Sequence, residues 1–350
     1  MNAVPVDELI DPHIHLWDVR GTERMVQNFV RTFGWNERVL RASAKRLFPE
    51  PVRMWFGERT ALLADYLPAD YRADSASSNV GRYVHIQAGW KGSDPTAPVG
   101  ETEWLASLDD GPAAIVGHAD LELGADVGSV LRAHGAASDR FRGIRYMLSH
   151  HPNENVHAFA ERADLTIDPQ WLDGYEQLAE HGLSFDAWCF HGQLEEVAVL
   201  AERVPEVPVV LDHCGTPVGI AGPHQGVGVS QQERVRIADE WRAGIERLAS
   251  VPHVMCKLSG LLMPALGFGF DETTAEPSVA ELVDRLSPLI AHCIDMFGPE
   301  RCMVASNFPV DAVSARYDTV MSAMAEIVGV HGEDAEQRML TGTAAEFYKL

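Results

Sequence analysis

Cysteine and basic residues are both scarce in this sequence. The five cysteines among 350 residues are scattered, and no two have the Cys-x-x-Cys spacing of a redox or zinc motif. We therefore expect reduced, buried thiols. Lysine and arginine number 28 against 51 acidic residues, which gives a formal net charge of −23. The chain thus lacks the basic character that binding to nucleic acids or anionic membranes requires.

Long apolar runs are missing as well. No stretch approaches the roughly 20 apolar residues that span a bilayer. The first residues, MNAVPVDELIDP, contain neither the basic nor the apolar segment of a signal peptide. We expect a cytoplasmic protein that acts on a small-molecule substrate and has no nucleic-acid or membrane partner. Whether it forms a homo-oligomer stays open.

Short apolar runs alternate along the chain with segments of helical periodicity. Strands are predicted near Leu9–Trp17, Val80–Ala88, Ala113–Leu121, Arg142–Leu148, Leu183–Phe190, Val207–His213, His253–Ser259 and Arg301–Asn307. Helices are predicted at Trp171–His181, Leu194–Arg203, Gln232–Ala249, Val279–Phe297 and Tyr317–Val328. Eight strands that alternate with helices imply parallel pairing and predict an α/β fold, a (β/α)8 TIM barrel.

An open doubly wound sheet is the alternative fold. Such a sheet usually carries a glycine-rich phosphate loop after its first strand, and neither GxGxxG nor GxxxxGK[ST] occurs here. We therefore predict one barrel domain over residues 1–350, with an insertion at approximately residues 21–75. A long loop after a barrel strand lies at the C-terminal face, so we interpret the insertion as a lid. A fixed surface excursion or a subunit contact is the alternative.

Two histidines two residues apart lie in the first predicted strand. With side chains alternating across the strand, one face is apolar and the other carries Asp11, His13, His15 and Trp17. We expect this second face to point into the barrel. His13 and His15 would then flank one substrate oxygen or bind one metal ion, and Trp17 would contact the substrate.

Two further residues are predicted at the C-terminal rim, where barrel enzymes place their catalytic groups. His213 ends an apolar strand before a glycine turn, and Asn307 lies just before Pro309, which stops the last strand. His213 is the leading candidate for the general base, and Asp311 is a second candidate.

Three polar residues on other strands complete the predicted site. Arg145 on the fourth strand suits binding of a carboxylate or polarisation of an acyl oxygen, with a structural ion pair as the alternative. Gln87, like His85, alternates with apolar residues and is predicted to point inward. Lys257 at the end of the seventh strand is expected to reach the substrate, or else to pair with a neighbouring carboxylate.

These elements resemble the amidohydrolase superfamily, specifically its amidohydrolase-2 group of TIM-barrel hydrolases and lactonases. The resemblance extends over collinear blocks along nearly the whole chain. The blocks are Tyr66–Ser75 (YLPADYRADS), Phe141–Leu148 (FRGIRYML), Val209–Gly215 (VVLDHCG), Lys257–Leu261 (KLSGL) and Arg301–Asp311 (RCMVASNFPVD). The resemblance implies hydrolysis of a lactone or a similar ester or amide at the C-terminal ends of the strands.

The resemblance also implies roles for particular residues. His13 and His15 match the first-strand pair of the family, His213 matches its sixth-strand histidine, and Asn307 stands where the family usually has aspartate. A neutral amide cannot act as a base near pH 7. We therefore expect a divalent metal such as zinc to be weakly held by His13, His15 and His213, or to be absent.

The predicted function is a hydrolase that opens a small lactone bearing carboxylate or hydroxyl groups. A decarboxylase or lactone isomerase on the same scaffold is the nearest alternative. An inactive ligand-binding protein is the second alternative, because the family's aspartate is missing at Asn307.

Overall fold

The computed structural model describes residues 8–350 except residues 25, 51, 54–59, 161 and 274. Eight parallel strands pair in the order of the sequence. They are β1 (Leu9–Ile14), β2 (Val80–Ile86), β3 (Ala114–Gly117), β4 (Phe141–Met147), β5 (Ser184–Trp188), β6 (Val209–Leu211), β7 (Val254–Leu258) and β8 (Cys302–Val304). A bridge from Ile14 to Phe308 joins the first strand to the segment after the last. The predicted (β/α)8 barrel is thereby confirmed.

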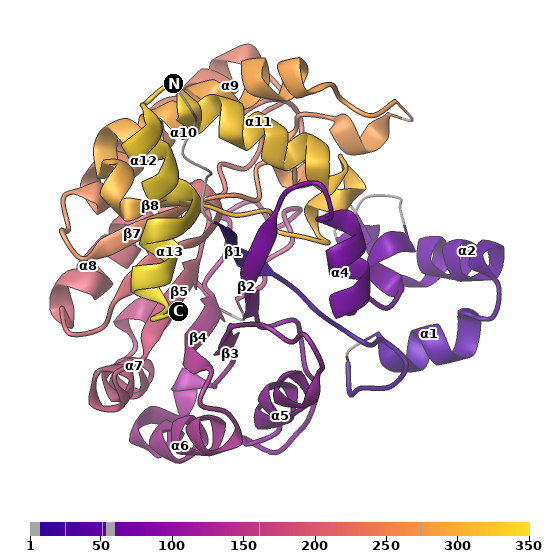
Figure 1. Cartoon of the computed structure of the whole chain (residues 1–350), viewed down its shortest axis with the longest axis vertical. Helices are drawn as coiled ribbons and strands as arrows, with labels where there is room; N and C mark the ends of the chain where they lie inside the picture. The colour runs from indigo at the N-terminus through magenta and orange to yellow at the C-terminus, as the bar shows by residue number, and fades with distance from the viewer. Residues whose placement is uncertain (1–7, 25, 51, 54–59, 161, 274) are drawn as a thin grey trace.

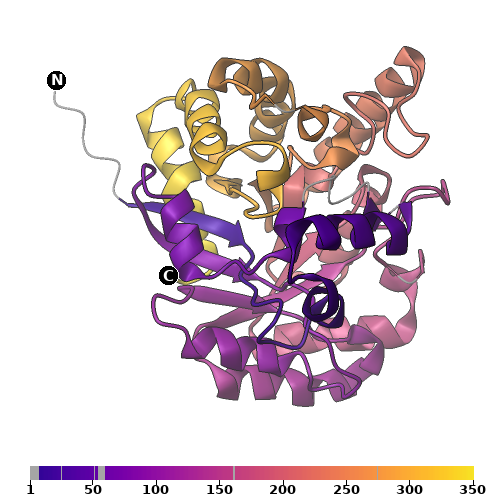
Figure 2. The ribbon, with the colours of Figure 1, turned by 90° about the vertical axis from the view of Figure 1, so that its right-hand side faces the viewer.

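Helices surround the strands in both ribbon views (Figures 1 and 2). The predicted helices are present as α7 (Pro169–His181), α8 (Leu194–Arg203), α9 (Gln231–Ala249), α10 (Val279–Phe297) and α11 (Tyr317–Gly329). The outer layer also contains α5 (Val99–Ser107) and α6 (Val127–Ala137), and α12 (Glu333–Gln337) and α13 (Thr343–Phe347) follow α11. Among the described residues, no helix combines the length and the apolar character needed to cross a membrane.

Local signals explain where these helices start and stop, as α7 illustrates. Asp168 accepts a hydrogen bond from the Trp171 N–H at 2.9 Å, and Pro169 occupies the first turn. The helix ends at Gly182, whose φ of 64° is the left-handed conformation that glycine adopts without strain.

The interior of the barrel has an apolar layer toward the N-terminal ends of the strands. Buried side chains from five strands meet there, and Ala344 of α13 and Tyr348 just after it close this end of the barrel. The cluster consists of Ile10, Val84, Ile86, Ala114, Val116, Val210, Met303, Ala344 and Tyr348. In Figure 1, α13 lies in front of the strands. Apolar filling of this end leaves the opposite end of the barrel for polar chemistry.

The predicted face of the first strand is wrong for Asp11. The pairing of β1 with β2 is irregular between Asp11 and Ile14. The Asp11 carboxylate therefore leaves the barrel and accepts hydrogen bonds at 3.0 Å from the hydroxyl groups of Tyr71 and Tyr317, which lie on the outer helices α4 (Pro68–Asp74) and α11. Ile10 points into the barrel instead. A β-bulge re-aims side chains in this way, and a strict two-residue period does not anticipate it.

The predicted inward direction of His85 is also wrong. Its Nδ1 accepts a hydrogen bond from the Leu16 N–H at 3.1 Å, and its Nε2 lies 3.7 Å from the Glu101 carboxylate on the outer helix α5. Glu101 also pairs with Arg24, whose guanidinium donates to the Ala88 carbonyl at 2.8 Å. His85 thus belongs to a buried network that anchors the base of the segment after β1.

The insertion after β1 contains α1 (Gln27–Phe33), α2 (Glu37–Leu47), a 3-10 turn at Thr60–Leu63 and α4. In Figure 1, α1 and α2 extend from one side of the barrel. Residues 25, 51 and 54–59 of the predicted insertion lie outside the described residues. Its interpretation as a lid stays a prediction.

Candidate active site

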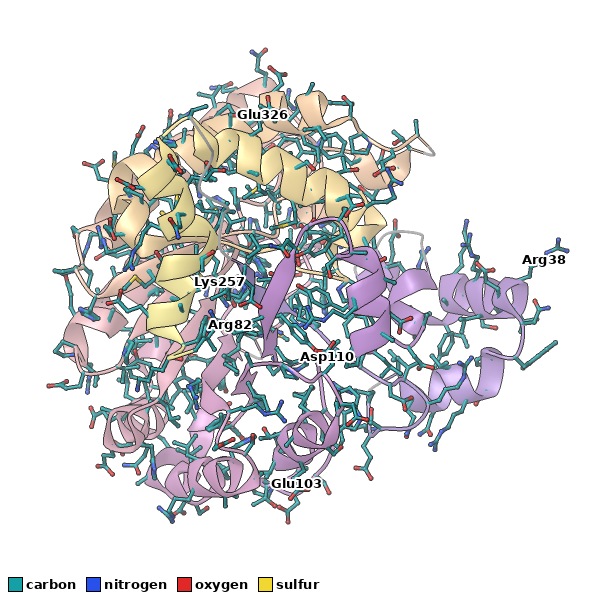
Figure 3. All side chains as sticks on the ribbon, in the orientation of Figure 1. Arg38, Arg82, Glu103, Asp110, Lys257 and Glu326 are labelled. Carbon is teal, nitrogen blue, oxygen red and sulfur yellow. The ribbon has the colours of Figure 1, made fainter. Side chains whose placement is uncertain are left out.

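A buried ammonium group lies at the centre of the polar end of the barrel. Lys257 on β7 donates to Asp186 of β5 at 2.5 Å, and its Nζ lies 3.2 Å from Asp212 Oδ1 and 3.1 Å from His13 Nδ1. All four side chains are fully buried. Figure 3 places Lys257 within the ring of strands, whereas Glu103 and Glu326 project outward. Of the two predicted roles for Lys257, the structure supports pairing with carboxylates.

The network fixes the protonation of its members. Burial raises the pKa of Asp186 to about 6, although the Lys257 ammonium opposes this. Burial also acts to raise the pKa of Asp212, but Lys257 and His13 outweigh it and hold that pKa well below its usual range. Burial and the Lys257 charge lower the pKa of His13. At neutral pH these shifts leave Asp186 and Asp212 as carboxylates and His13 as a neutral imidazole.

The network continues to the end of the chain through Tyr348. The Tyr348 hydroxyl donates to Asp186 Oδ2 at 2.8 Å, and the Lys257 ammonium lies 5.4 Å from the centre of the Tyr348 ring. Tyr348 therefore belongs to the apolar layer through its ring and donates a hydrogen bond to the charged cluster through its hydroxyl.

His213 stands on a turn that leaves β6. Its backbone φ of 56° is left-handed, a conformation that costs a non-glycine residue about 1–3 kcal/mol and is concentrated at functional sites. Its Nδ1 hydrogen-bonds with the Ser259 hydroxyl at 2.9 Å. A Cβ at Gly260 would lie 2.4 Å from the His213 ring, so the glycine makes room for it. Burial lowers the pKa of His213 to about 3, although Asp212 opposes this.

His15 and Trp17 lie on one side of His13. The His13 and His15 rings are 5.0 Å apart in an edge-to-face arrangement, and Trp17 stacks on His15 at 6.4 Å. His15 Nδ1 hydrogen-bonds with the Ile86 carbonyl at 2.8 Å. The Trp17 indole N–H donates to the Ala64 carbonyl of the insertion at 2.7 Å. Because the indole N–H is already hydrogen-bonded, Trp17 can contact a substrate only through the face or edge of its ring.

Arg145 lies on the other side of the cluster. Its Nη2 donates to the Gln87 carbonyl at 2.7 Å, and its guanidinium lies 5.7 Å from the centre of the Trp188 ring. The Nε–H group is buried with no hydrogen-bond partner among the described residues. The side chain of Gln87 accepts from the Gly89 N–H at 3.0 Å, so Gln87 holds Arg145 through its backbone.

Asn307 is close to the histidine pair through its backbone. Its N–H donates to the His13 carbonyl at 2.9 Å, and its φ is 58°. Its side-chain amide donates to Asp311 Oδ1 at 2.8 Å. Burial raises the pKa of Asp311 to about 7, although the Asn307 amide opposes this. The two predicted residues thus form a pair in the loop after β8.

The donor set of a divalent metal site is present in this cluster. His13, Asp212 and His213 offer ligand atoms within 4.8 Å of one another, and His13 Nε2 and Asp212 Oδ2 are buried without a hydrogen-bond partner among the described residues. Two imidazoles and a carboxylate are a known ligand set for Zn²⁺. The predicted third ligand, His15, is not in this group, and Asp212 takes its place. The Lys257 ammonium lies against two of these ligands and would weaken binding by repulsion.

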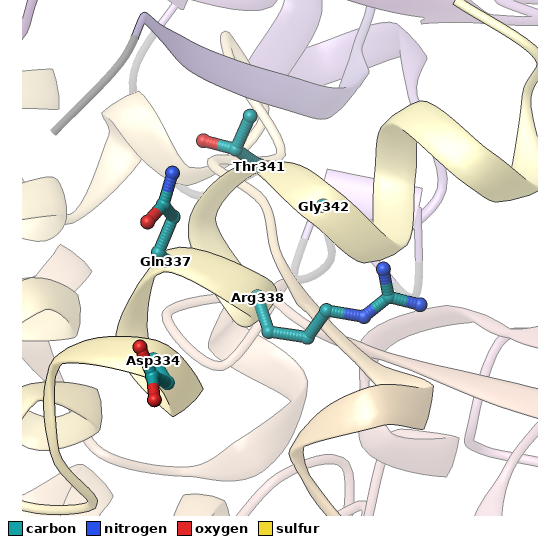
Figure 4. A pocket seen from close by; sticks show the side chains of 5 residues that line it. All are labelled: Asp334, Gln337, Arg338, Thr341 and Gly342. Atoms are coloured by element: carbon teal, nitrogen blue, oxygen red, sulfur yellow. The ribbon is translucent and has the colours of Figure 1, made fainter.

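Cavities are also found outside the histidine cluster. A cavity of 650 Å³ between α9 and the segments that follow β4 and β5 is lined by His150, His151, Phe190, His191 and Arg236, among others. Phe190 packs against Trp188, and Trp188 packs against His213. A second cavity of 250 Å³ contains Arg338 (Figure 4), and that guanidinium already pairs with Glu300 and Glu346.

Three members of the site were not predicted from the sequence. Asp212 precedes His213 in the block VVLDHCG, but no role was predicted for it. Asp186 lies in a predicted strand between apolar neighbours. A charged residue inside an apolar strand is rarely buried unless it is paired with an opposite charge. Asp186 could therefore have been predicted to have a buried cationic partner. Tyr348, in contrast, is distant in sequence from Asp186 and Lys257, the two site residues that it contacts.

Comparisons with known proteins agree with this geometry. The amidohydrolase family profile matches residues 10–350. The chain is 32% identical over 345 residues to an uncharacterised protein of Sinorhizobium fredii, covering 98% of each. It is 30% identical over 298 residues to an L-fucono-1,5-lactonase of Burkholderia multivorans, covering 85% of this chain and 90% of that one.

Solved structures extend the comparison to the fold. A crystal structure of an amidohydrolase from Burkholderia multivorans with bound zinc superposes with a TM-score of 0.70 and 25% identity, covering 98% of this chain and 99% of that one. A 5-carboxyvanillate decarboxylase from Sphingomonas paucimobilis superposes with a TM-score of 0.55 at 13% identity, with the same coverage, and shows the fold alone. Fold and site together define a barrel enzyme of the hydrolase type. The chain belongs to the amidohydrolase family.

The contact between Tyr348 and Asp186 generates the first prediction. Tyr348→Phe keeps the ring and removes the hydrogen bond, which we expect to lower the free energy of unfolding by about 2 kcal/mol. The lost donor stabilised the ionised carboxylate, so the pKa of Asp186 should rise above about 6. If ionised Asp186 holds Lys257 in place, the acid limb of the kcat/KM profile moves to higher pH.

Tyr175→Phe is the matched control. The Tyr175 hydroxyl is buried without a hydrogen-bond partner among the described residues, so its removal should leave the pH profile unchanged. An acid limb that stays in place in Tyr348→Phe would show that Tyr348 serves only as apolar filling.

Proposed function

We propose that the protein opens the ring of a small, hydroxylated lactone of the sugar-acid type by attack of water. The convergence of Arg145 with the imidazoles of His13, His15 and His213 at one end of the barrel carries this proposal. The two relatives of the genus Burkholderia that are named L-fucono-1,5-lactonase, 30% and 27% identical to this chain, support the lactone class. The acidic chain, with a net charge of −23, favours a small molecule over nucleic acid as the partner.

Arg145 is assigned to the lactone carbonyl. Its guanidinium is held by the Gln87 carbonyl and by the face of Trp188, and its Nε–H remains for a ligand. A fixed donor in a buried site stabilises the charge that develops on the acyl oxygen and contributes on the order of 3 kcal/mol to catalysis.

His213 is assigned to the attacking water. Its low pKa keeps the imidazole neutral at neutral pH, and with Nδ1 on Ser259 the Nε2 atom is left to accept a proton. The water oxygen forms a bond to the acyl carbon, and the ring carbon–oxygen bond then breaks. The proton taken from water passes from His213 to the leaving ring oxygen, so the product is a hydroxy acid. The Asp212 carboxylate stabilises the imidazolium in between.

A divalent metal is not required by this sequence of steps. If one is bound by His13, Asp212 and His213, it would supply polarisation of an acyl oxygen or of water. We propose that such a metal is weakly held, because Lys257 already places a positive charge against His13 and Asp212.

Decarboxylation is the rival reaction on this fold, and the path of the water distinguishes it. In H₂¹⁸O with a panel of sugar 1,5-lactones, we expect one ¹⁸O atom in the carboxylate of each product and no loss of carbon. A pH indicator measures the rate, and mass spectrometry measures the label. His213→Gln should lower kcat/KM at least about a hundredfold, roughly 2.7 kcal/mol. Release of CO₂, or an isomerised product without label, would contradict the proposal.

The planar fork of Arg145 generates a separate prediction. Arg145→Lys should lower kcat/KM nearly as much as Arg145→Met, because a point charge cannot hold both the Gln87 carbonyl and the substrate. Arg72→Lys is the control, since Arg72 binds Asp110 and the Val80 carbonyl at the opposite end of the barrel. Native kinetics in Arg145→Lys would show that the shape of the guanidinium has no role.

A further inference from the structure

Three cysteines that are far apart in sequence meet outside the barrel wall. Cys214 follows His213 after β6, Cys256 lies in β7, and Cys293 lies on α10. Their sulfur atoms all lie within 4.8 Å of one another, and each residue is fully buried. The three thiols therefore face one another from three separate elements of the fold.

This spacing is close to that of a common ligand shell. Metal–sulfur bonds of about 2.3 Å place three sulfur ligands about 4 Å apart around one centre. A shift of less than an ångström in flexible side chains would bring the thiols to that distance. Cys302 on β8 lies opposite Cys256 on β7 in the backbone register. Its thiol, however, donates to the Cys293 carbonyl at 3.8 Å. It is not one of the three mutually close sulfur ligands.

The number of ligands and the net charge decide which centre fits. The group contains three sulfur atoms and, among the described residues, no fourth ligand of the histidine, cysteine or carboxylate type. Three thiolates around Cu⁺ would leave two buried negative charges, and around Zn²⁺ or Cd²⁺ they would leave one. Around trivalent arsenic they leave none. An uncompensated charge in a fully buried place is costly, so a trivalent centre is favoured.

We propose that Cys214, Cys256 and Cys293 form a binding site for a trivalent thiophilic metalloid, of which arsenous acid is the simplest source. In the binding step three arsenic–oxygen bonds break and three arsenic–sulfur bonds form. Each thiol proton joins a departing hydroxyl, so arsenous acid and three thiols give one neutral tris-thiolate and three waters. No oxidant or reductant takes part. The site is distinct from the histidine cluster and does not depend on the proposed lactone chemistry.

Occupation of the site should stabilise the fold, because the centre would link β7, α10 and the turn after β6. A ligand that binds only the folded protein raises the melting temperature, and the stabilisation grows with the logarithm of the ratio of free ligand to Kd. Entry requires local opening, since all three thiols are buried. We therefore expect slow binding that is complete only after prolonged incubation.

The test uses the whole reduced protein incubated with sodium arsenite. Native mass spectrometry should show one arsenic atom per chain with the loss of three hydrogen atoms, together with a higher melting temperature. Cys293→Ala and Cys256→Ala should each weaken binding at least tenfold and abolish the shift in melting temperature. Cys189→Ala, which removes a buried cysteine outside the group, should bind as the native chain does.

Two control measurements accompany the arsenite experiment. Urea denaturation establishes that each variant is folded before binding is compared. Cadmium, which would leave a buried negative charge, should bind at this site more weakly than arsenite. Absence of arsenic from the folded native protein, equal binding by Cys293→Ala, or cadmium binding tighter than arsenite would overturn the assignment.

Discussion

The buried ammonium of Lys257 is the interaction on which the polar end of the barrel depends. It lies between the carboxylates of Asp186 and Asp212, both without solvent exposure. Removal of one partner from a buried ion pair costs about 3–5 kcal/mol, because the remaining charge stays desolvated. Here two carboxylates would remain close together. The same ammonium lowers the pKa of His13 and of Asp212, so it also sets the charges that a substrate meets.

The barrel divides its interior between packing and chemistry. Apolar residues of the strands and Tyr348 fill the end where α13 lies, and charged residues fill the other. Tyr348 joins the two layers, since its ring is part of the apolar cluster and its hydroxyl reaches Asp186. Tyr348, just after α13, thereby contacts charged groups on β5 and β7.

The sequence was sufficient to predict the barrel because its signals are local. Most strands lie in short runs that are largely apolar, and the helices α8 and α10 have the predicted bounds. His13, His213 and Arg145 were predicted as site residues, and the structure brings all three into one buried cluster. Their catalytic roles stay predictions. The pairing partners did not follow, since Lys257 and Asp186 are 71 residues apart in sequence. The bulge after Asp11 was equally invisible, because it depends on pairing with β2 rather than on the residues of β1 alone.

Lys257 already places a cation beside the candidate metal ligands His13 and Asp212. The affinity of the site for zinc tests this role of Lys257 most directly. The zinc dissociation constant of the native protein and of Lys257→Met can be measured by competition with a chromogenic chelator. At an effective dielectric constant near 20, a like charge about 4 Å away costs several kcal/mol, and 1.4 kcal/mol is already tenfold. We therefore predict zinc binding at least about tenfold tighter in Lys257→Met. Equal or weaker binding in that variant, with the fold intact, would contradict the account.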